Sequence, residues 1–158
     1  METDSINIDI NRMKHCVSVA RKAAHLGKSL MLWDREKCRE MFLLGYLHDV
    51  GYEHSDDHDS HAAVGGELLR RSGYKYWEEV YWHGKPDAAY RSDELDVLNL
   101  SDLLIDHKGE DVGLTARLEG IRSRYGNDSR QYVDACRLAD SLGSSFDLIH
   151  RPSVEVDI

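Results

Sequence analysis

Apolar side chains recur at intervals of three and four residues through most of this 158-residue chain, the spacing that gathers them on one face of an α-helix. The pattern predicts helices over residues 12–29, 35–49, 61–72, 74–84, 92–105, 113–125 and 129–142. Strand-like alternation is absent from the sequence. We therefore predict an all-α fold, a bundle of six to seven helices.

Residues that favour helix ends support several of these boundaries. Asp34 and Ser92 precede the second and fifth helices, where a side-chain oxygen can accept hydrogen bonds from the first backbone N–H groups. Gly51 is expected to stop the second helix, and the polar segment EHSDDHDS beyond it is expected to be a surface loop. A chain of this length predicts one domain, over residues 11–145, with a leader at 1–10 and a tail at 146–158.

Charge and composition narrow the classes of function. The net charge of −9 argues against a large nucleic-acid footprint, which depends on clustered Lys and Arg, although it leaves room for a local cationic pocket. No apolar run is long enough to span a membrane, and the acidic N-terminus lacks the order of a secretory signal. We expect a cytoplasmic protein that binds neither nucleic acid nor membrane. The three cysteines lack CxxC spacing and are expected to be reduced.

The most informative residues are ionisable side chains on the apolar faces of the predicted helices. Burying such a group costs roughly several kcal/mol unless it is paired or bound to a metal. A single histidine at such a position is more often a hydrogen-bonded core residue than a ligand. Several together, beside an aspartate, favour one metal cluster that satisfies them all. The residues on these faces are His15, His48, His61, His83 and Asp102, and the aspartate beside them is Asp49.

Imidazole and carboxylate donors indicate which ions such a cluster would bind. They suit Fe, Mn, Zn, Ni or Co, and the absence of nearby thiols argues against a structural zinc site. Asp49 can bridge two cations because its two oxygens point to neighbouring positions. Two metal ions about 3.5–4 Å apart can activate a water molecule and hold the oxygens of a phosphoryl group. The pattern therefore favours a dinuclear hydrolytic site that attracts an anionic substrate.

Five motifs follow one another between residues 15 and 104: HCVSVARKAAHL, GYLHDVGY, HAAVGGELL, VYWHGKP and LNLSDLL. In their order and composition they resemble the HD-domain superfamily of metal-dependent phosphohydrolases, and the two middle histidines resemble its dinuclear subset. The resemblance implies a helical bundle around two divalent ions, iron before manganese, zinc, nickel, cobalt or magnesium. It implies two ligand sets that share a bridging Asp49: His15, His48, Asp49 and Asp102, and Asp49, His61 and His83.

The resemblance also implies catalytic roles for His48 and Asp49, with a metal-bridging hydroxide attacking phosphorus. Two ligand assignments keep alternatives. His54 and His58 compete with His61, which is preferred for its His-x-x-x-Gly spacing and its place on the apolar face. Similarly, the aspartate one turn beyond Asp102, at position 106, could replace it.

One departure from the family pattern concerns phosphate binding. Many of these phosphohydrolases carry Lys after HD-x-Gly, and this chain has Tyr52 there. Lys85 is the nearest replacement, with Arg91 and Lys22 behind it. The three can equally be solvated surface residues, and Tyr52 can donate a hydrogen bond to a ligand or simply cover the site. The remaining histidines, including His107, are expected at the surface.

Three functions compete at this stage. The leading hypothesis is hydrolysis of a nucleotide or another small phosphoester. The second is an oxygenase with a mixed-valent di-iron centre, which a branch of the same superfamily builds on the same ligand pattern. The third is a domain that binds metal and nucleotide without catalysis. The expected partner is a small phosphorylated substrate, a nucleotide by preference, and a homodimer stays open.

Overall fold

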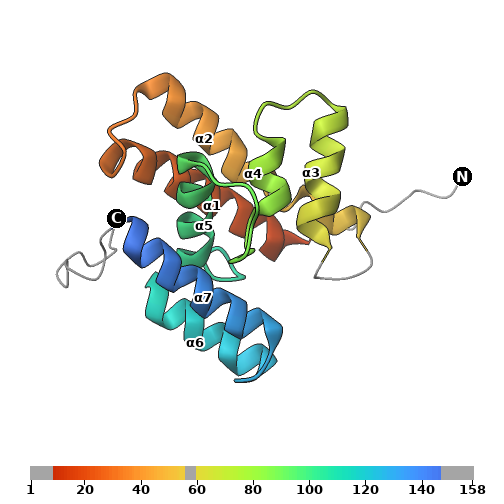
Figure 1. Ribbon diagram of the computed structural model, residues 1–158, viewed down its shortest axis with the longest axis vertical. Coiled ribbons are helices and arrows are strands. Elements are labelled where there is room, and N and C mark those ends of the chain that lie inside the picture. The colour runs from red at the N-terminus through yellow and green to blue at the C-terminus, as the bar shows by residue number, and fades with distance from the viewer. Residues whose placement is uncertain (1–8, 56–59, 147–158) are drawn as a thin grey trace, which may run out of the picture.

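The computed structural model describes residues 9–55 and 60–146, which form seven α-helices and one short 3-10 helix without a β-strand (Figure 1). The predicted all-α fold is confirmed. The helices are α1 (Ile10–Ser29), α2 (Arg35–Leu47), η1 (Val50–His54), α3 (His61–Arg71), α4 (Trp77–Trp82), α5 (Asp93–Leu104), α6 (Gly113–Tyr125) and α7 (Arg130–Ser145).

Helix α5 lies at the centre of this arrangement. It packs against α1, α2, α4, α6 and α7, and most of its side chains are buried on every face. Around it, α1 with α2, α3 with α4, and α6 with α7 form three pairs (Figure 1). A helix that is apolar all round is typical of a protein core, so α5 serves as the support on which the other helices meet.

The apolar faces predicted for the first two helices are confirmed. Val19 and Leu26 of α1 and Leu44 of α2 are fully buried. The two helices approach closely at Gly45, where a Cβ atom would lie only 2.7 Å from Cα of Ala20. Because nothing larger than hydrogen fits there, the C-terminal end of α2 lies directly against α1.

The predicted helix caps are also present. Oδ1 of Asp34 accepts a hydrogen bond from the backbone N–H of Lys37 at 2.8 Å, and Oγ of Ser92 accepts one from Leu95 at 2.9 Å. Both bonds satisfy N–H groups that have no partner within their helix. These caps set where α2 and α5 begin, and thereby the register of the residues farther along each helix.

The end of α2 differs from the prediction. The helix stops at Leu47 rather than at residue 49, and the chain continues into η1, which occupies part of the segment expected to be a loop. The reason is contact with α3: a Cβ atom on Gly51 would overlap the carbonyl oxygen of His61 and lie 2.6 Å from the backbone nitrogen of Gly65. The tighter turn brings the backbone of η1 onto α3.

The third and fourth helices also differ from their predictions. Leu68 stands at helical spacing from His61 and Val64 and was therefore expected on the apolar face of α3, but it is 38% exposed, whereas Leu69 is buried. Helix α4 covers only Trp77–Trp82, because the turn that closes α3 continues to Tyr74, whose N–H donates to the carbonyl of Leu69 at 3.0 Å. His83 consequently lies just after α4 rather than within it.

The chain ends lie largely outside the described residues. Asp9 caps α1 and Ile10 already belongs to that helix, while α7 continues to Ser145. The predicted leader at 1–10 and tail at 146–158 otherwise fall in residues 1–8 and 147–158, so the proposed domain limits stay a prediction. Among the described helices, none is long and apolar enough to cross a membrane.

Candidate metal centre

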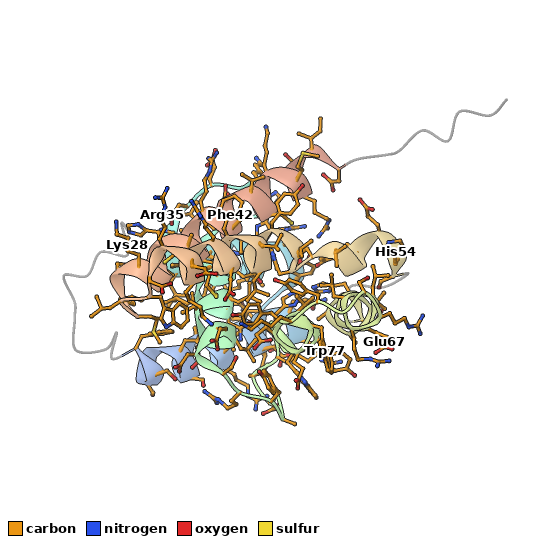
Figure 2. All side chains as sticks on the ribbon, turned by 90° about the horizontal axis from the view of Figure 1, so that it is seen from above. Lys28, Arg35, Phe42, His54, Glu67 and Trp77 are labelled. Carbon is orange, nitrogen blue, oxygen red and sulfur yellow. The ribbon has the colours of Figure 1, made fainter. Side chains whose placement is uncertain are left out.

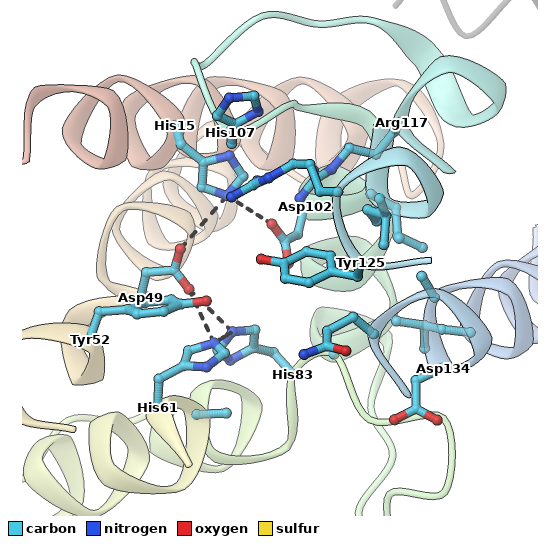
Figure 3. A pocket seen from close by; sticks show the side chains of 18 of the residues that line it. His15, Asp49, Tyr52, His61, His83, Asp102, His107, Arg117, Tyr125 and Asp134 are labelled. Atoms are coloured by element: carbon cyan, nitrogen blue, oxygen red, sulfur yellow. Dashed lines mark hydrogen bonds and ion pairs between the residues drawn. The ribbon is translucent and has the colours of Figure 1, made fainter. Parts of the chain in front are cut away.

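Six ionisable side chains from separate parts of the fold converge beside the central helix. Figure 3 labels all of them except His48. Four of them are nearly buried, with exposed fractions below a tenth, and the other two are partly exposed. They are His15 of α1, His48 and Asp49 after α2, His61 at the start of α3, His83 after α4 and Asp102 of α5. The structure thus brings together all six side chains that the sequence singled out.

Asp49 lies between two groups of histidines. Its Oδ2 atom is 3.3 Å from Nε2 of His48 and 3.7 Å from Nε2 of His15. Its Oδ1 atom is 3.5 Å from Nε2 of His61 and 3.4 Å from Nε2 of His83 (Figure 3). Each carboxylate oxygen therefore faces its own pair of ring nitrogens, the arrangement that a bridging carboxylate requires.

Asp102 completes the first of these groups. Its Oδ1 atom is 2.9 Å from Nε2 of His15 and 3.5 Å from Nε2 of His48. Within each group the ligand atoms lie no more than 4.8 Å from one another, and the two groups are His15, His48 and Asp102, and Asp49, His61 and His83. The second group has the residues of the second implied set, and the first group has those of the first implied set except Asp49.

Backbone carbonyls orient three of the histidine rings. Each Nδ1 atom meets a carbonyl oxygen: His15 that of Asp106 at 2.8 Å, His48 that of Gly45 at 2.6 Å, and His83 that of Val80 at 2.6 Å. A carbonyl only accepts, so Nδ1 carries the proton and Nε2 presents its lone pair to the cluster. Ligand histidines in metal sites are held in the same way.

The cluster concentrates negative charge. Burial by itself raises the pKa of Asp49, but the His48 and His83 rings beside it hold the pKa well below its usual range. Burial likewise works against the charge on Asp102, yet the neighbouring His15 and His48 rings lower its pKa strongly. Both carboxylates are therefore ionised at neutral pH, in the state that binds a cation.

His48 has the clearest need for a further partner. Its Nε2 atom is buried and makes no hydrogen bond to any described residue. Burial works against a charge on the ring, but Asp49 and Asp102 raise its pKa well above the ordinary value. Positive charge is thus favoured beside this nitrogen, and a cation can supply it in place of a proton. The nitrogen and oxygen donors fit divalent ions such as Fe, Mn or Zn.

Cys16 lies close to this cluster, but its thiol is not expected to bind a metal. Its thiol falls within 4.8 Å of the ligand atoms of His48 and Asp49. Burial raises the pKa of the thiol to about 11, so it stays protonated at neutral pH. A metal binds thiolate rather than thiol, and we therefore keep Cys16 outside the ligand set.

The structure also bears on the alternative ligands. His54 is exposed at the outer edge of the molecule (Figure 2), and His58 falls outside the described residues. The Asp106 carboxylate accepts the backbone N–H groups of Lys108 and Glu110, each at 2.9 Å, and so closes a turn. These contacts favour His61 and Asp102 as the ligands.

A cavity of about 360 Å³ opens beside the cluster. Tyr52 and Lys85, two of the predicted substrate-binding residues, line it, and so does His107, which was expected only at the surface. Arg91 does not line the cavity, and its guanidinium instead lies 3.7 Å from Oδ1 of Asp96. Lys22, the other cation considered, is buried against Asp111.

The far wall of this cavity comes from α6 and α7, where the sequence suggested no functional residues. It carries Arg117, Arg124 and Tyr125 of α6 and Arg130 of α7. Arg117 and Tyr125 extend from α6 toward Asp102 (Figure 3). Their helices follow the last recognised motif, and only the tertiary fold brings them over the cluster.

Arg12 is a second residue that the sequence analysis missed. Its guanidinium lies 3.6 Å from Oδ2 of Asp49 and 3.3 Å from the centre of the Tyr52 ring. That ring stacks in turn on His61, with centres 4.0 Å apart. Arg12 precedes His15 by three residues, which puts both on one face of a helix, and that spacing was the available signal.

Comparison with known proteins places these motifs in a family. The sequence matches the HD domain over residues 12–142. Among curated proteins it is similar to Ribonuclease Y of Cutibacterium acnes (strain DSM 16379 / KPA171202), with 37% identity over 95 residues. The match covers 59% of this chain and 16% of that protein. No solved structure gives a significant match.

Proposed function

Because this chain belongs to the HD domain family, we propose that it is a metal-dependent phosphohydrolase that acts on a nucleotide or another small phosphoester. The observation that carries the proposal is the position of Asp49, whose two oxygens face separate pairs of histidine nitrogens. In this proposal two divalent ions, iron before manganese or zinc, are held by the six clustered residues. When bound, such ions lower the pKa of water and neutralise phosphoryl oxygens.

Cationic side chains of the chain itself lie where they can bind the phosphoryl group. Tyr52 stands where many relatives carry a cationic lysine, at the position after HD-x-Gly. Arg12 supplies a cation in its place, because the Arg12 guanidinium lies over the Tyr52 ring and beside Asp49. Lys85 and Arg117 add positive charge on the cavity wall. A guanidinium can contact two phosphate oxygens at once, so Arg12 is the residue that we assign to orient the phosphoryl group.

The relative supports this direction. Its name, Ribonuclease Y, refers to cleavage of RNA, whose linkages are phosphoesters. This chain spans a small part of that protein, so RNA enters only as one candidate substrate. The position of Arg12 also weakens the case for an oxygenase, since it places a cation suited to phosphate beside Tyr52 although the lysine is missing there.

The test is a screen for phosphoester hydrolysis on protein purified without chelators. We expect metal-dependent hydrolysis of at least one phosphoester and its loss in Asp49→Ala. The same screen under strict anaerobiosis should give the same rates. Failure to hydrolyse any member of a broad panel would refute the proposal, and oxygen uptake by iron-loaded protein would favour the oxygenase.

A further inference from the structure

We propose that the substrate of this site is a phosphodiester joining two nucleoside-sized groups, which occupy two cavities on either side of Asp49. This inference rests on the proposed function and narrows its substrate class. It starts from a second cavity, of about 380 Å³, behind Arg12 and Tyr52. Each cavity falls within the roughly 300–1,000 Å³ of small-molecule sites, so each can hold a bulky organic group.

The two cavities adjoin at Asp49, the candidate bridging ligand. Asp9, Arg12, Asp49 and Tyr52 line both of them. A substrate that spans this junction therefore has its middle beside the Asp49 carboxylate and its two ends in different cavities. A phosphodiester has that form, because its phosphorus lies between two esterified groups. A monoester would leave one cavity without a role.

Charge at the junction matches a diester. Arg12, about 30% exposed, is the cation nearest the Asp49 carboxylate on this side, 3.6 Å from its Oδ2 atom. The guanidinium of Arg12 stacks on the Tyr52 ring, and this contact fixes the plane of the guanidinium. A phosphodiester carries one negative charge and two unesterified oxygens, and a single guanidinium can pair with both.

The two cavities differ in chemistry, which distinguishes the two ends of the substrate. Lys85, Arg117 and Arg124 line the first, and Nε of Arg117 is buried without a hydrogen-bond partner among the described residues. Beyond the shared junction, the second is lined by apolar and aromatic side chains and an acid: Met13, Cys16, Tyr46, Leu47, Val50 and Glu53. We therefore assign the more anionic end to the first cavity and an uncharged end to the second.

The reaction balances with water alone. Water adds its oxygen to phosphorus while the P–O bond to the group in the second cavity breaks. That group leaves as an alcohol and takes up a proton, and the phosphate stays on the other group as a monoester. The monoester no longer spans both cavities, which favours its release.

Matched substrates provide the first part of the test. The probes are bis(4-nitrophenyl) phosphate against 4-nitrophenyl phosphate, and the dinucleotide UpU against UMP, with metal-loaded protein. We expect kcat/KM to be at least about tenfold higher for the diester of each pair, equivalent to roughly 1.4 kcal/mol. An RNA decamer beside UpU separates a polymeric source of the diester from a free dinucleotide, and preference for either over UMP supports the proposal.

A variant that fills the second cavity provides the matched control. Met13 lines that cavity and is 44% exposed, so Met13→Trp adds bulk there without disturbing the core. His25→Trp places the same side chain on an exposed position of α1 outside both cavities. We expect Met13→Trp alone to lower the diester-to-monoester ratio of kcat/KM, by about tenfold. Calorimetry should show the same selective loss of UpU binding.

The outcomes separate this inference from the proposed function. Hydrolysis of monoesters in preference to diesters would overturn the inference and leave the phosphohydrolase standing. Equal ratios in Met13→Trp and His25→Trp would overturn it as well, since the second cavity would then hold no part of the substrate. Hydrolysis of no ester at all would remove the proposed function and the inference together.

Discussion

Oδ1 of Asp49 lies 3.4 Å from Nε2 of His83, on the opposite side of the carboxylate from the oxygen that faces His48. If both oxygens bind cations, loss of the carboxylate affects both ions and loss of His83 affects one. We expect Asp49→Ala to abolish stable binding of both metals. His83→Ala should weaken chiefly the second, by more than the roughly 10–100-fold typical of losing an outer-shell partner.

Metal content measured by mass spectrometry after gel filtration checks this prediction. Asp134→Ala is a suitable control, because Asp134 lines the same cavity from α7 but lies outside the cluster. It should retain the metal content of the parent. Equal metal in Asp49→Ala and the parent would contradict the bridging role.

A second prediction concerns which of two nearby aspartates, Asp102 or Asp106, binds the metal. Asp102 faces His15 at 2.9 Å, whereas the Asp106 side chain accepts backbone N–H groups in its own turn. We expect Asp102→Asn to lose metal and Asp106→Asn, which retains an acceptor oxygen, to keep it. Metal content of the two proteins, measured side by side, decides between them. The reverse result would exchange their roles.

Glycine at position 51 carries a prediction about stability. A methyl group there would overlap the His61 carbonyl, so Gly51→Ala must push η1 away from α3. Overpacking of this kind costs about 1–3 kcal/mol. Urea unfolding should show that loss, together with weaker metal binding through the displaced His61.

The control for this change is Gly120→Ala. Gly120 lies within α6, and apart from its own stretch of helix a Cβ atom there would meet no atom within 4 Å. Alanine is the better helix former, so this substitution should stabilise the protein by up to about 1 kcal/mol. Similar losses in both variants would show that close packing at Gly51 is not the cause.

A fourth prediction concerns pH. Partial burial works against the charges of Lys37 and Glu94, but the 2.7 Å contact between them raises the pKa of Lys37 and lowers that of Glu94. The stabilisation is therefore fully present between about pH 4.5 and 10.5, the ordinary values of the two groups. It is lost as pH falls through the lowered pKa of Glu94 or rises through the raised pKa of Lys37.

We expect Glu94→Gln to lower the free energy of unfolding by about 1 kcal/mol at pH 7, and by progressively less below pH 4.5. Urea titrations of both proteins across this range measure the difference. Glu67→Gln is the control, because the Glu67–Arg70 pair lies on the surface, where such pairs contribute little. A constant difference for Glu94→Gln at every pH would exclude the ion pair as its cause.

Much of the candidate centre was predictable because its residues follow helical spacing. His15 lies on the same face as Val19 and Leu26, and His48 on the same face as Leu44, so the pattern that marks the core marks the ligands too. Side chains on the buried faces of packed helices are brought together by the packing itself. That is why side chains such as His15 and Asp102 could be named before the fold was known, whereas Asp49 was named from the motif GYLHDVGY.

The missed features depend on contacts between distant segments. Arg117 reaches the cavity only because α6 folds over α5, and no local pattern records that contact. The early end of α2 follows from the approach of Gly51 to α3, and the exposure of Leu68 follows from which side of α3 meets its neighbours. Tertiary packing overrides local preference in such places.

The wide separation of the clustered residues along the chain has a consequence for folding. His15 and Asp102 stand 87 positions apart yet touch at 2.9 Å. An ion held between them would act as a cross-link, closing a long loop of chain much as a disulfide does, with greater effect for longer loops. The thermal midpoint would then rise with the concentration of unbound metal, and a chelator would act on this protein as a mild denaturant.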